Sequence, residues 1–391
     1  MKHTILWSCL WMLLGIACKQ APRYEITAEF PGAPDGVTFY LACGANTLDS
    51  ATVSGGRMVM NGAVEAPVEC VLSTFYENNG RPAGKMMMLW VENSRIRIAC
   101  PWDSLPDNSF YGGPQTVVSG SASHDVYGVY QTATGELRRQ VSELSSGMLR
   151  LEHAGVFTPE NTRLGIEKAR KYNALNREIA RREKELMARY PASPVTLQVF
   201  TDMLQTRSRL TLEEVDTLYH GLDTTLQCRP EWAFMQKAYE IYRRTACGEL
   251  YTDFTVTDEK GAAKHFSDYF QPGKYHLLVC WASWCHPCRM EIPHLKHIHA
   301  VCGDCFPIIA VSADKDNDAW QKAVREEQPG YVQLRMAKDE RGETLASYYG
   351  FQGIPYTLVL DGEGRVVASG VFGGVLDALL ADWYGDAVKE L

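Results

Sequence analysis

Two cysteines separated by two residues, Cys285 and Cys288, carry the most specific chemical signal in this sequence. This spacing lets both sulfurs meet within one helical turn, so the pair can cycle between a dithiol and a disulfide. The pair follows a continuous apolar run at 276–282 and precedes a segment with helical character. A helix start directs unpaired N–H groups and the positive end of the helix dipole at the first sulfur, which stabilises its thiolate. We therefore predict that Cys285 is the exposed nucleophile and that Cys288 is the buried thiol that resolves the mixed disulfide.

The residues around this pair resemble a known active site. The segment 281–289, WASWCHPCR, is similar to the active site of the thioredoxin superfamily, and most similar to that of periplasmic thiol–disulfide reductases of cytochrome maturation. The resemblance covers roughly residues 248–391. Pro293 matches the proline inside the family's active-site helix, and Ile354-Pro355 matches its cis-proline. The resemblance implies a cis bond before Pro355, pairing of the Ile354 backbone with a substrate strand, and no organic cofactor.

Three neighbours of the cysteines are expected to support the reaction. Trp284 and Pro287 belong to the matched segment, and Pro287 fits the first helical turn because no backbone N–H bond is lost there. His286, when protonated, places a positive charge near the thiolate and so favours the reduced form. We therefore predict a reduction potential above that of thioredoxin, which is about −270 mV.

One position departs from the family's pattern. The family often carries a buried acid six residues before the nucleophile, and this acid takes the proton of the resolving thiol; here the position is Val279. Glu291 follows Cys288 by three residues on the same predicted helix and could replace that acid, or it could be a surface carboxylate. Without a proton acceptor, Cys288 would attack slowly near neutral pH.

A second pair with the same spacing, Cys302 and Cys305, follows the predicted helix. Taken with the first pair it approximates the spacing of a zinc site. A helix of about 15 residues would separate the pairs by some 20 Å, which disfavours a shared metal ion. We predict no metal site, and instead a local disulfide or two free thiols; an auxiliary redox pair is the third alternative. Histidines between the pairs are predicted to line a solvated helix side: His294, His297 and His299.

The elements that must position this chemistry change character along the chain. Residues 24–120 contain short β-rich runs punctuated by Gly, Asn, Asp and Pro, which predicts a small antiparallel β domain. Its segments 49–53 and 92–93 resemble a domain of unknown function that precedes thioredoxin domains in envelope lipoproteins. Residues 121–247 are predicted to be helical. Residues 248–391 alternate strands and helices, which predicts an α/β thioredoxin-like domain with helices on both faces of a sheet.

The first 18 residues have the pattern of a lipoprotein signal peptide. A weakly basic start precedes the apolar run 5–16, which is shorter than the roughly 20 residues that a spanning helix needs. The run ends in a small residue before Cys18, although Gly15 stands where such signals usually carry Leu. We predict lipidation of Cys18 and a periplasm-facing, lipid-anchored location in the cell envelope. A plain secreted protein and an uncleaved anchor are the alternatives.

Composition and site together define the predicted function. The net charge is −8 and no basic tract exists, so nucleic acid is an unfavourable partner. We predict a protein-disulfide reductase that acts on disulfide-containing exported proteins and receives electrons from a membrane thiol donor, as the resemblance implies. A thiol peroxidase is one alternative, but Ala282 stands where that class carries a hydroxyl. A binding lipoprotein with a thioredoxin-fold scaffold is the other.

Overall fold

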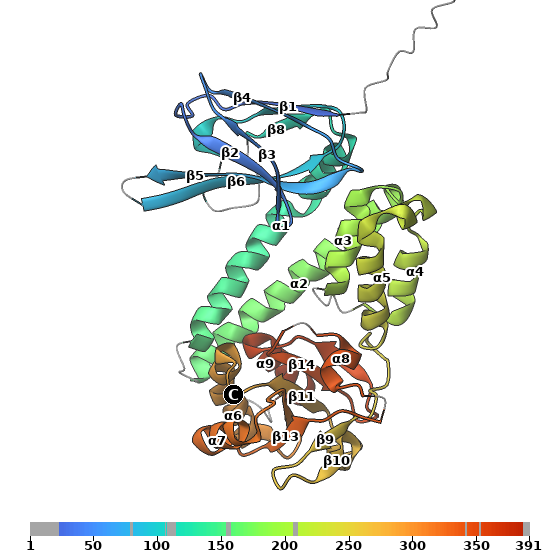
Figure 1. The fold of residues 1–391 in the computed structure, drawn as a ribbon. Coiled ribbons are helices and arrows are strands. Elements are labelled where there is room, and N and C mark those ends of the chain that lie inside the picture. Colours follow the sequence, from blue (N-terminus) through green and yellow to red (C-terminus); the bar gives the residue numbers. More distant parts are fainter. Residues whose placement is uncertain are drawn as a thin grey trace, which may run out of the picture. The chain divides into compact units, whose positions relative to one another are not determined.

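The computed structural model describes residues 23–78, 81–105, 107, 115–153, 158–205, 210–340, 342–351 and 353–385, and it divides into two compact units between Asp125 and Val126 (Figure 1). The predicted signal segment 1–18, with Cys18, lies outside the described residues. Within the described ranges, every helix is too short or too polar to cross a bilayer.

The first unit contains two four-stranded sheets, with strand orders β4-β1-β7-β8 and β3-β2-β5-β6. In β7 the alternating sequence buries Ile96 and Ile98 and leaves the arginines exposed, as a half-buried strand requires. The predicted antiparallel β domain is confirmed, with one parallel pair, β1 and β7, that the sequence did not reveal. The strands are β1 (Tyr24–Glu29), β2 (Thr38–Cys43), β3 (Asn46–Thr52), β4 (Arg57–Gly62), β5 (Val68–Asn78), β6 (Arg81–Val91), β7 (Arg95–Ala99) and β8 (Val117–Ser119), with a 3₁₀ turn at Trp102–Ser104.

The helical middle region is confirmed. Thr158 caps the second helix, where its side chain accepts a hydrogen bond from the Asn161 N–H at 3.3 Å, as the Thr-Pro-Glu sequence predicts. The helices are α1 (Ala122–His153), α2 (Pro159–Arg189), α3 (Pro194–Gln205), α4 (Leu212–His220) and α5 (Pro230–Arg243), with a 3₁₀ turn at Thr224–Cys228.

Within the second unit, α2 packs against α9 (Gly373–Tyr384). Two glycines allow this approach: a Cβ on Gly374 would lie 2.9 Å from the Gly165 carbonyl oxygen. Close backbone contact of this kind needs residues without side chains. The helical segment is therefore packed onto the C-terminal part of the chain rather than tethered beside it.

The C-terminal part is an α/β layer structure, which confirms the predicted thioredoxin-like fold. Its seven-stranded sheet has the order β10-β9-β13-β12-β11-β14-β15, and β11 is parallel to β12 but antiparallel to β14. The elements are β9 (Thr255–Thr257), β10 (Ala263–His265), a 3₁₀ turn (Phe266–Tyr269), β11 (His276–Trp281), α6 (His286–Cys302), β12 (Ile308–Ser312), α7 (Asn317–Glu327), β13 (Val332–Met336), α8 (Leu345–Tyr349), β14 (Tyr356–Leu360), β15 (Val366–Ser369) and α9.

Strand β11 lies inside this sheet and is buried along its whole length. Its alternate residues point to opposite faces: Leu277 and Val279 pack with α6 and α9, while Leu278 and Cys280 pack with α8. A continuous apolar run is the pattern of a strand covered on both faces. Because β11 ends at Trp281 and α6 begins at His286, the cysteine pair lies at the junction of a rigid strand and a helix.

Candidate active site

Cys285 and Cys288 form a disulfide at the start of α6, with their Cα atoms 5.3 Å apart. Cys285 is the N-cap residue of the helix, and its Sγ accepts a hydrogen bond from the Cys288 N–H at 3.2 Å. Pro287 occupies the first turn, where the missing N–H costs no helical bond. The first sulfur therefore lies where the helix presents an N–H donor and its positive dipole end.

The expected difference in exposure between the two cysteines is wrong for this oxidised state. Cys285 retains 5% of its accessible surface and Cys288 retains 3%, so both are buried. Cys285 is covered because its Sγ lies 3.6 Å from the carbonyl oxygen of Ile354, from the loop before β14. What distinguishes the cysteines is position: Cys285 caps the helix, whereas Cys288 lies within its first turn.

An aspartate that sequence analysis did not identify anchors the turn before the cysteines. Asp314, 5% exposed, accepts hydrogen bonds from the Ser283 N–H at 2.8 Å and the Ser283 hydroxyl at 2.6 Å. The Ser312 hydroxyl also donates to Asp314, at 2.6 Å. Asp314 follows β12, and Ser283 follows β11. The two strands become neighbours only when the sheet folds, so no spacing in the sequence links Asp314 to Ser283.

The residues predicted to meet a substrate lie on two segments around Cys285. The Ile354–Pro355 peptide bond is cis, as the resemblance implied. Trp284 is 70% exposed, and His286 and Pro287 are also exposed. The structure thus brings Ile354 against the first cysteine and leaves the Trp284 side chain open to solvent beside it.

Glu291 lies inside the domain, so its alternative placement as a surface carboxylate is wrong. It is 9% exposed and lines the same small cavity as Cys288 and Pro355. Its Oε1 accepts a hydrogen bond from the Gly373 N–H at 3.2 Å. A carboxylate is therefore held close to the second cysteine, although Val279 leaves the strand position of the family's acid apolar.

His294 is buried as well, which corrects the prediction that it lines a solvated face. Its Nδ1 lies 3.0 Å from Glu291 Oε1 and its Nε2 lies 2.7 Å from Asp377 Oδ1 on α9. Burial disfavours the charged imidazolium, but the carboxylates of Asp377 and Glu291 outweigh burial and raise the pKa of His294 well above its usual value. A protonated His294 donates through both nitrogens and joins α6 to α9. Sequence reasoning missed Asp377, since an acid within an apolar helix gives no sign of its partner.

The second cysteine pair lies at the other end of α6. Cys302 is the last residue of that helix and is 5% exposed; Cys305 follows it and is partly buried. Burial, then the neighbouring Cys305 and Asp377, raises the pKa of Cys302 to about 12. Seventeen helical residues span about 25 Å, so the two pairs cannot ligate one zinc ion. Across the described ranges, no three His, Cys, Asp or Glu side chains converge as metal ligands.

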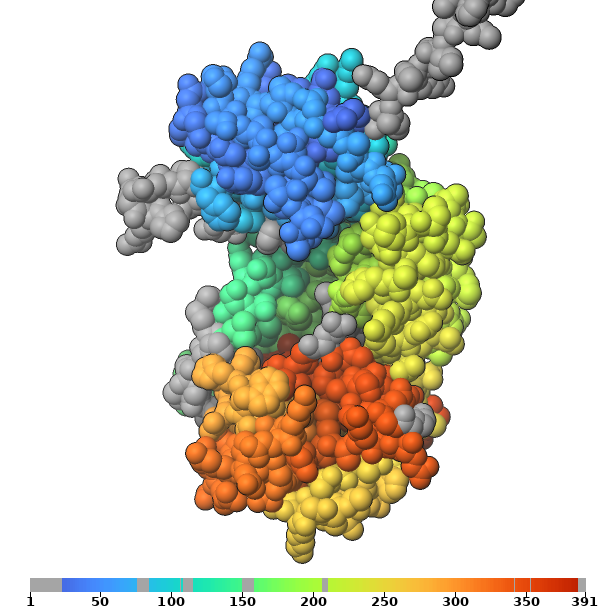
Figure 2. Space-filling model, viewed as in Figure 1, coloured from blue at the N-terminus to red at the C-terminus, as the bar shows by residue number. Residues whose placement is uncertain are grey.

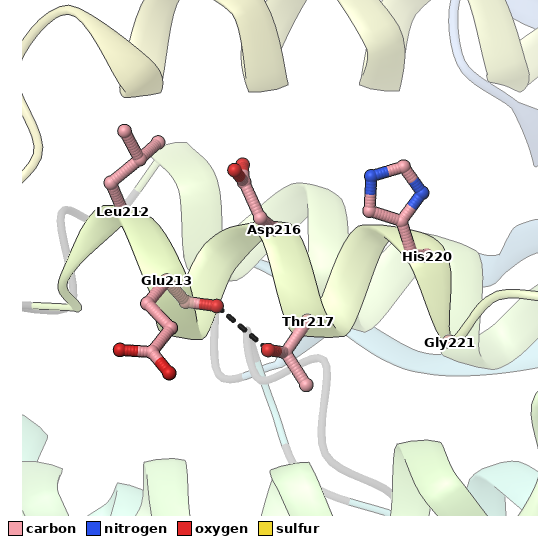
Figure 3. Close-up of a pocket in the computed structure, with 6 residues that line it drawn as sticks. All are labelled: Leu212, Glu213, Asp216, Thr217, His220 and Gly221. Atoms are coloured by element: carbon pink, nitrogen blue, oxygen red, sulfur yellow. Dashed lines mark hydrogen bonds between the residues drawn. The ribbon is translucent and has the colours of Figure 1, made fainter.

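A wide depression lies on α4 in the second unit. In Figure 3 the side chains of Leu212, Asp216 and His220 point to one side of that helix, Glu213 and Thr217 point to the other, and Gly221 follows the helix. The Thr217 hydroxyl donates to the Glu213 carbonyl oxygen at 2.8 Å, and Asp216 accepts from the Tyr239 hydroxyl at 2.7 Å. These hydrogen bonds are made within α4 and between α4 and α5. No cysteine lines the depression. Its lining consists of Leu212, Glu213, Asp216, Thr217, His220 and Gly221.

Two regions of the chain match known families. A family described as thioredoxin-like matches residues 273–366, and a domain of unknown function, DUF4369, matches residues 24–127. The thiol:disulfide interchange protein HelX of Rhodobacter capsulatus is 33% identical over 108 residues, which are 27% of this chain and 58% of HelX. The chain thus spans less than two thirds of that relative's length.

The thioredoxin-like protein YneN of Bacillus subtilis is 30% identical over 123 residues, 30% of this chain and 68% of YneN. The solved thioredoxin domain of a thiol-disulfide oxidoreductase from Bacteroides vulgatus is 29% identical, covers 35% of this chain and 97% of its own, and has a TM-score of 0.33.

Proposed function

Because the chain belongs to the thioredoxin-like family, we propose that it is a thiol–disulfide oxidoreductase that reduces disulfides of exported proteins through Cys285 and Cys288. The observation that carries the proposal is the position of this pair. The disulfide caps α6, and Cys285 Sγ lies 3.6 Å from the Ile354 carbonyl oxygen, beside the cis bond to Pro355. The likeness to thiol–disulfide oxidoreductases supports exchange chemistry at this pair.

The reaction begins from the reduced pair. The Cys285 thiolate attacks one sulfur of the substrate disulfide, forms a mixed disulfide and releases the other substrate sulfur as a thiolate, which takes up a proton. The helix start favours the attacking thiolate electrostatically. Cys288, as a thiolate, then attacks Cys285 Sγ, which re-forms the enzyme disulfide and releases the second substrate sulfur as a thiolate that takes up a proton. Two electrons pass from the enzyme dithiol to the substrate.

Resolution requires Cys288 to lose its proton. Glu291 lines the cavity that Cys288 also lines, and its carboxylate is held by the Gly373 N–H and His294. In the proposed mechanism Glu291 receives the Cys288 proton, so the buried carboxylate on the helix takes over the task of the acid missing at Val279.

Substrate recognition in this proposal uses the backbone before Pro355. An extended substrate segment pairs with Ile354, strand to strand, and brings its disulfide to Cys285. The Trp284 side chain, 70% exposed, forms an apolar wall beside the entering sulfur.

The proposed setting is the cell envelope. The signal-like pattern of residues 1–18 supports lipidation at Cys18 and a periplasm-facing location. The resemblance to periplasmic thiol–disulfide reductases supports a membrane thiol donor that reduces the Cys285–Cys288 disulfide after each turnover. Expression of the chain and of Cys18→Ser, followed by phase partition in detergent, tests the anchor. Wild type in the detergent phase and the variant in the aqueous phase would support it. Identical partition of the two would contradict it.

Insulin-disulfide reduction by the full chain, with dithiothreitol as electron source, tests the reaction. We expect wild type to precipitate insulin chains well above the dithiothreitol background, Cys285→Ser to fall to that background, and the matched Cys302→Ser to keep wild-type activity. Equal activity of Cys285→Ser and wild type would disprove the assignment of the nucleophile. Absence of activity in all three proteins would contradict the reductase proposal for this substrate.

A further inference from the structure

A cavity of about 530 Å³ in the second unit opens beside the cis-proline loop, and the proposed reaction leaves it without a role. One wall comes from the segment that precedes and includes Pro355, and the other comes from α5 of the helical segment. Figure 2 shows the yellow surface of the helical segment and the red surface of the C-terminal domain meeting on this face of the unit. Its lining includes Phe234, Lys237, Ile241, Phe351, Ile354 and Pro355.

The α5 wall is fixed to the thioredoxin-like domain. Ile241 packs directly on Gly350, where a Cβ would lie 2.4 Å from the Ile241 Cδ1 atom, and Gly350 has a positive φ of 58°. One turn further along, the Arg244 guanidinium donates to the Tyr348 carbonyl oxygen at 2.7 Å and lies 4.7 Å from the centre of the Tyr348 ring. Because α5 and α8 interlock at these points, the cavity has a defined shape on both sides.

The cavity and the redox site share two residues. Ile354 lines the cavity, and its carbonyl oxygen lies 3.6 Å from Cys285 Sγ. Pro355 lines both this cavity and the small one that Cys288 lines. A substrate strand that pairs with the Ile354 backbone must therefore pass the mouth of the cavity as its disulfide reaches Cys285. Successive side chains of a strand point to opposite sides, so a residue next to the attacked cysteine is placed to enter.

The residues that line the cavity determine which kind of substrate side chain it can bind. Phe234 is 53% exposed, an unusual amount of aromatic surface for a position inside a concave wall. Phe351 and Ile354 add apolar surface from the opposite side. Lys237 is exposed on the same wall as Phe234, and its ammonium group would repel a positively charged side chain in the cavity. Gln205 and Thr245 add polar groups elsewhere in the lining. The part formed by Phe234, Phe351 and Ile354 fits an apolar or aromatic side chain, and Lys237 disfavours a basic one.

We infer that this cavity is a substrate-specificity site, formed by the helical segment, which binds an apolar or aromatic side chain beside the disulfide of a polypeptide substrate. This inference rests on the proposed function, because it requires that Cys285 attack polypeptide disulfides. It gives the helical segment a direct part in substrate choice, and it predicts no effect on small disulfides that carry no side chain.

Single-turnover reduction by the pre-reduced full chain tests the site. The probes are two disulfide-bonded peptides that differ only in the residue next to one cysteine, Phe or Lys, and bis(2-hydroxyethyl) disulfide. We expect wild type to reduce the Phe peptide about tenfold faster than the Lys peptide, the scale on which an apolar pocket discriminates. Phe234→Ala should lose most of this preference. The matched control Leu164→Ala, an exposed residue of α2 at 40%, should keep it.

The three probes separate the inference from the proposed function. Reduction of the hydroxyethyl disulfide at equal rates by wild type and both variants, with loss of discrimination in Phe234→Ala alone, supports the site. Equal rates for the two peptides in wild type, or unchanged discrimination in Phe234→Ala, overturn the site but leave the reductase proposal standing. Failure of wild type to reduce any of the three probes overturns both.

Discussion

The two ends of helix α6 carry cysteine pairs with the same spacing and different properties. Cys285 and Cys288 form a disulfide at the N-terminus, where a backbone N–H donates to the first sulfur. Cys302 and Cys305 are thiols at the C-terminus, where burial and neighbouring groups raise the pKa of Cys302 to about 12. A spacing of two residues therefore brings two cysteines close together, but it does not determine how reactive they are.

Electrostatics explains why one spacing serves two purposes. A helix presents N–H groups and positive potential at its start, and carbonyl groups and negative potential at its end. A thiolate is stabilised at the first end and destabilised at the second. Cys302 also lies among apolar groups and close to Asp377, and both features oppose its ionisation. Reactivity follows from the end of the helix that a cysteine occupies.

The largest difference between the pairs should appear when one member of each is removed. Cys288→Ser should accumulate a covalent complex between Cys285 and a substrate such as insulin, because release then depends on an external thiol. Loss of the intramolecular step should slow release by about a thousandfold or more. Non-reducing gel electrophoresis detects the complex. Cys305→Ser, the matched change at the other end, should trap nothing; a trapped complex in that variant would give the second pair a redox role.

Alkylation of the reduced protein compares the thiols directly. The shift of the Cys302 pKa from 9.0 to about 12 implies roughly a thousandfold less thiolate at neutral pH. With iodoacetamide near neutral pH, mass spectrometry should find Cys285 modified well before Cys302. In denaturant the difference should disappear. If Cys302 of the folded protein reacted as fast as Cys285, the predicted difference in reactivity between the two pairs would be wrong.

The charged group between the two pairs should contribute to stability in a pH-dependent way. His294 joins Glu291, near the first pair, to Asp377, near the second. His294→Gln should cost about 3 kcal/mol in the free energy of unfolding, since it leaves buried carboxylates without their cation. Because the folded pKa of His294 lies above its unfolded value of 6.5, this stabilisation is complete below about pH 6.5 and is lost as pH rises through the folded pKa.

Urea unfolding of wild type and His294→Gln at about pH 6 and about pH 9 measures this effect. The stability difference should be larger at the lower pH. His286→Gln, an exposed residue of the same helix, serves as the control and should change stability little at either pH. A difference that is constant with pH would show that His294 is neutral in the folded protein.

The smallest expected effect concerns the reduction potential. An exposed charge near a helix end is worth at most about 1 kcal/mol, and 30 mV corresponds to about 1.4 kcal/mol for a two-electron couple. Replacement of a positively charged His286 in His286→Gln should therefore lower the potential of the Cys285–Cys288 pair by at most about 10–20 mV. Titration against defined ratios of reduced to oxidised dithiothreitol measures this potential. Cys305→Ser is the control, and its Cys285–Cys288 potential should equal that of wild type. A wild-type potential below about −270 mV would contradict the role assigned to His286.

Local patterns in the sequence predicted the Cys285–Cys288 pair and much of the structure around it. The apolar run at 276–282 is the buried strand β11, and Thr158 caps a helix as its sequence suggests. The cis bond before Pro355 followed from the resemblance, because no composition or periodicity marks a cis-proline. The parallel pairing of β1 with β7 could not be predicted, since strands so far apart in sequence have no turn to set their direction.

The environment of the site was harder to predict than its centre. His294 and Glu291 both look like polar residues on an amphipathic helix, and only the packing of α9 shows that they are buried. Helical periodicity tells which residues share a face but not what covers that face. For the same reason the exposure expected for Cys285 was wrong, because the covering carbonyl of Ile354 comes from 69 residues away.

Neighbouring residues were enough to place the cysteine pair. A buried strand, a helix start and two cysteines in one turn can be read from adjacent positions, because burial, capping and spacing are local properties. The groups that surround the pair depend on the packing of segments that are far apart in the chain. Asp314 reaches the turn from β12, Asp377 reaches α6 from α9, and α5 forms a wall beside Pro355. These contacts arise only when the sheet and its covering helices assemble, since separate segments gain specific partners only by burying their apolar faces together.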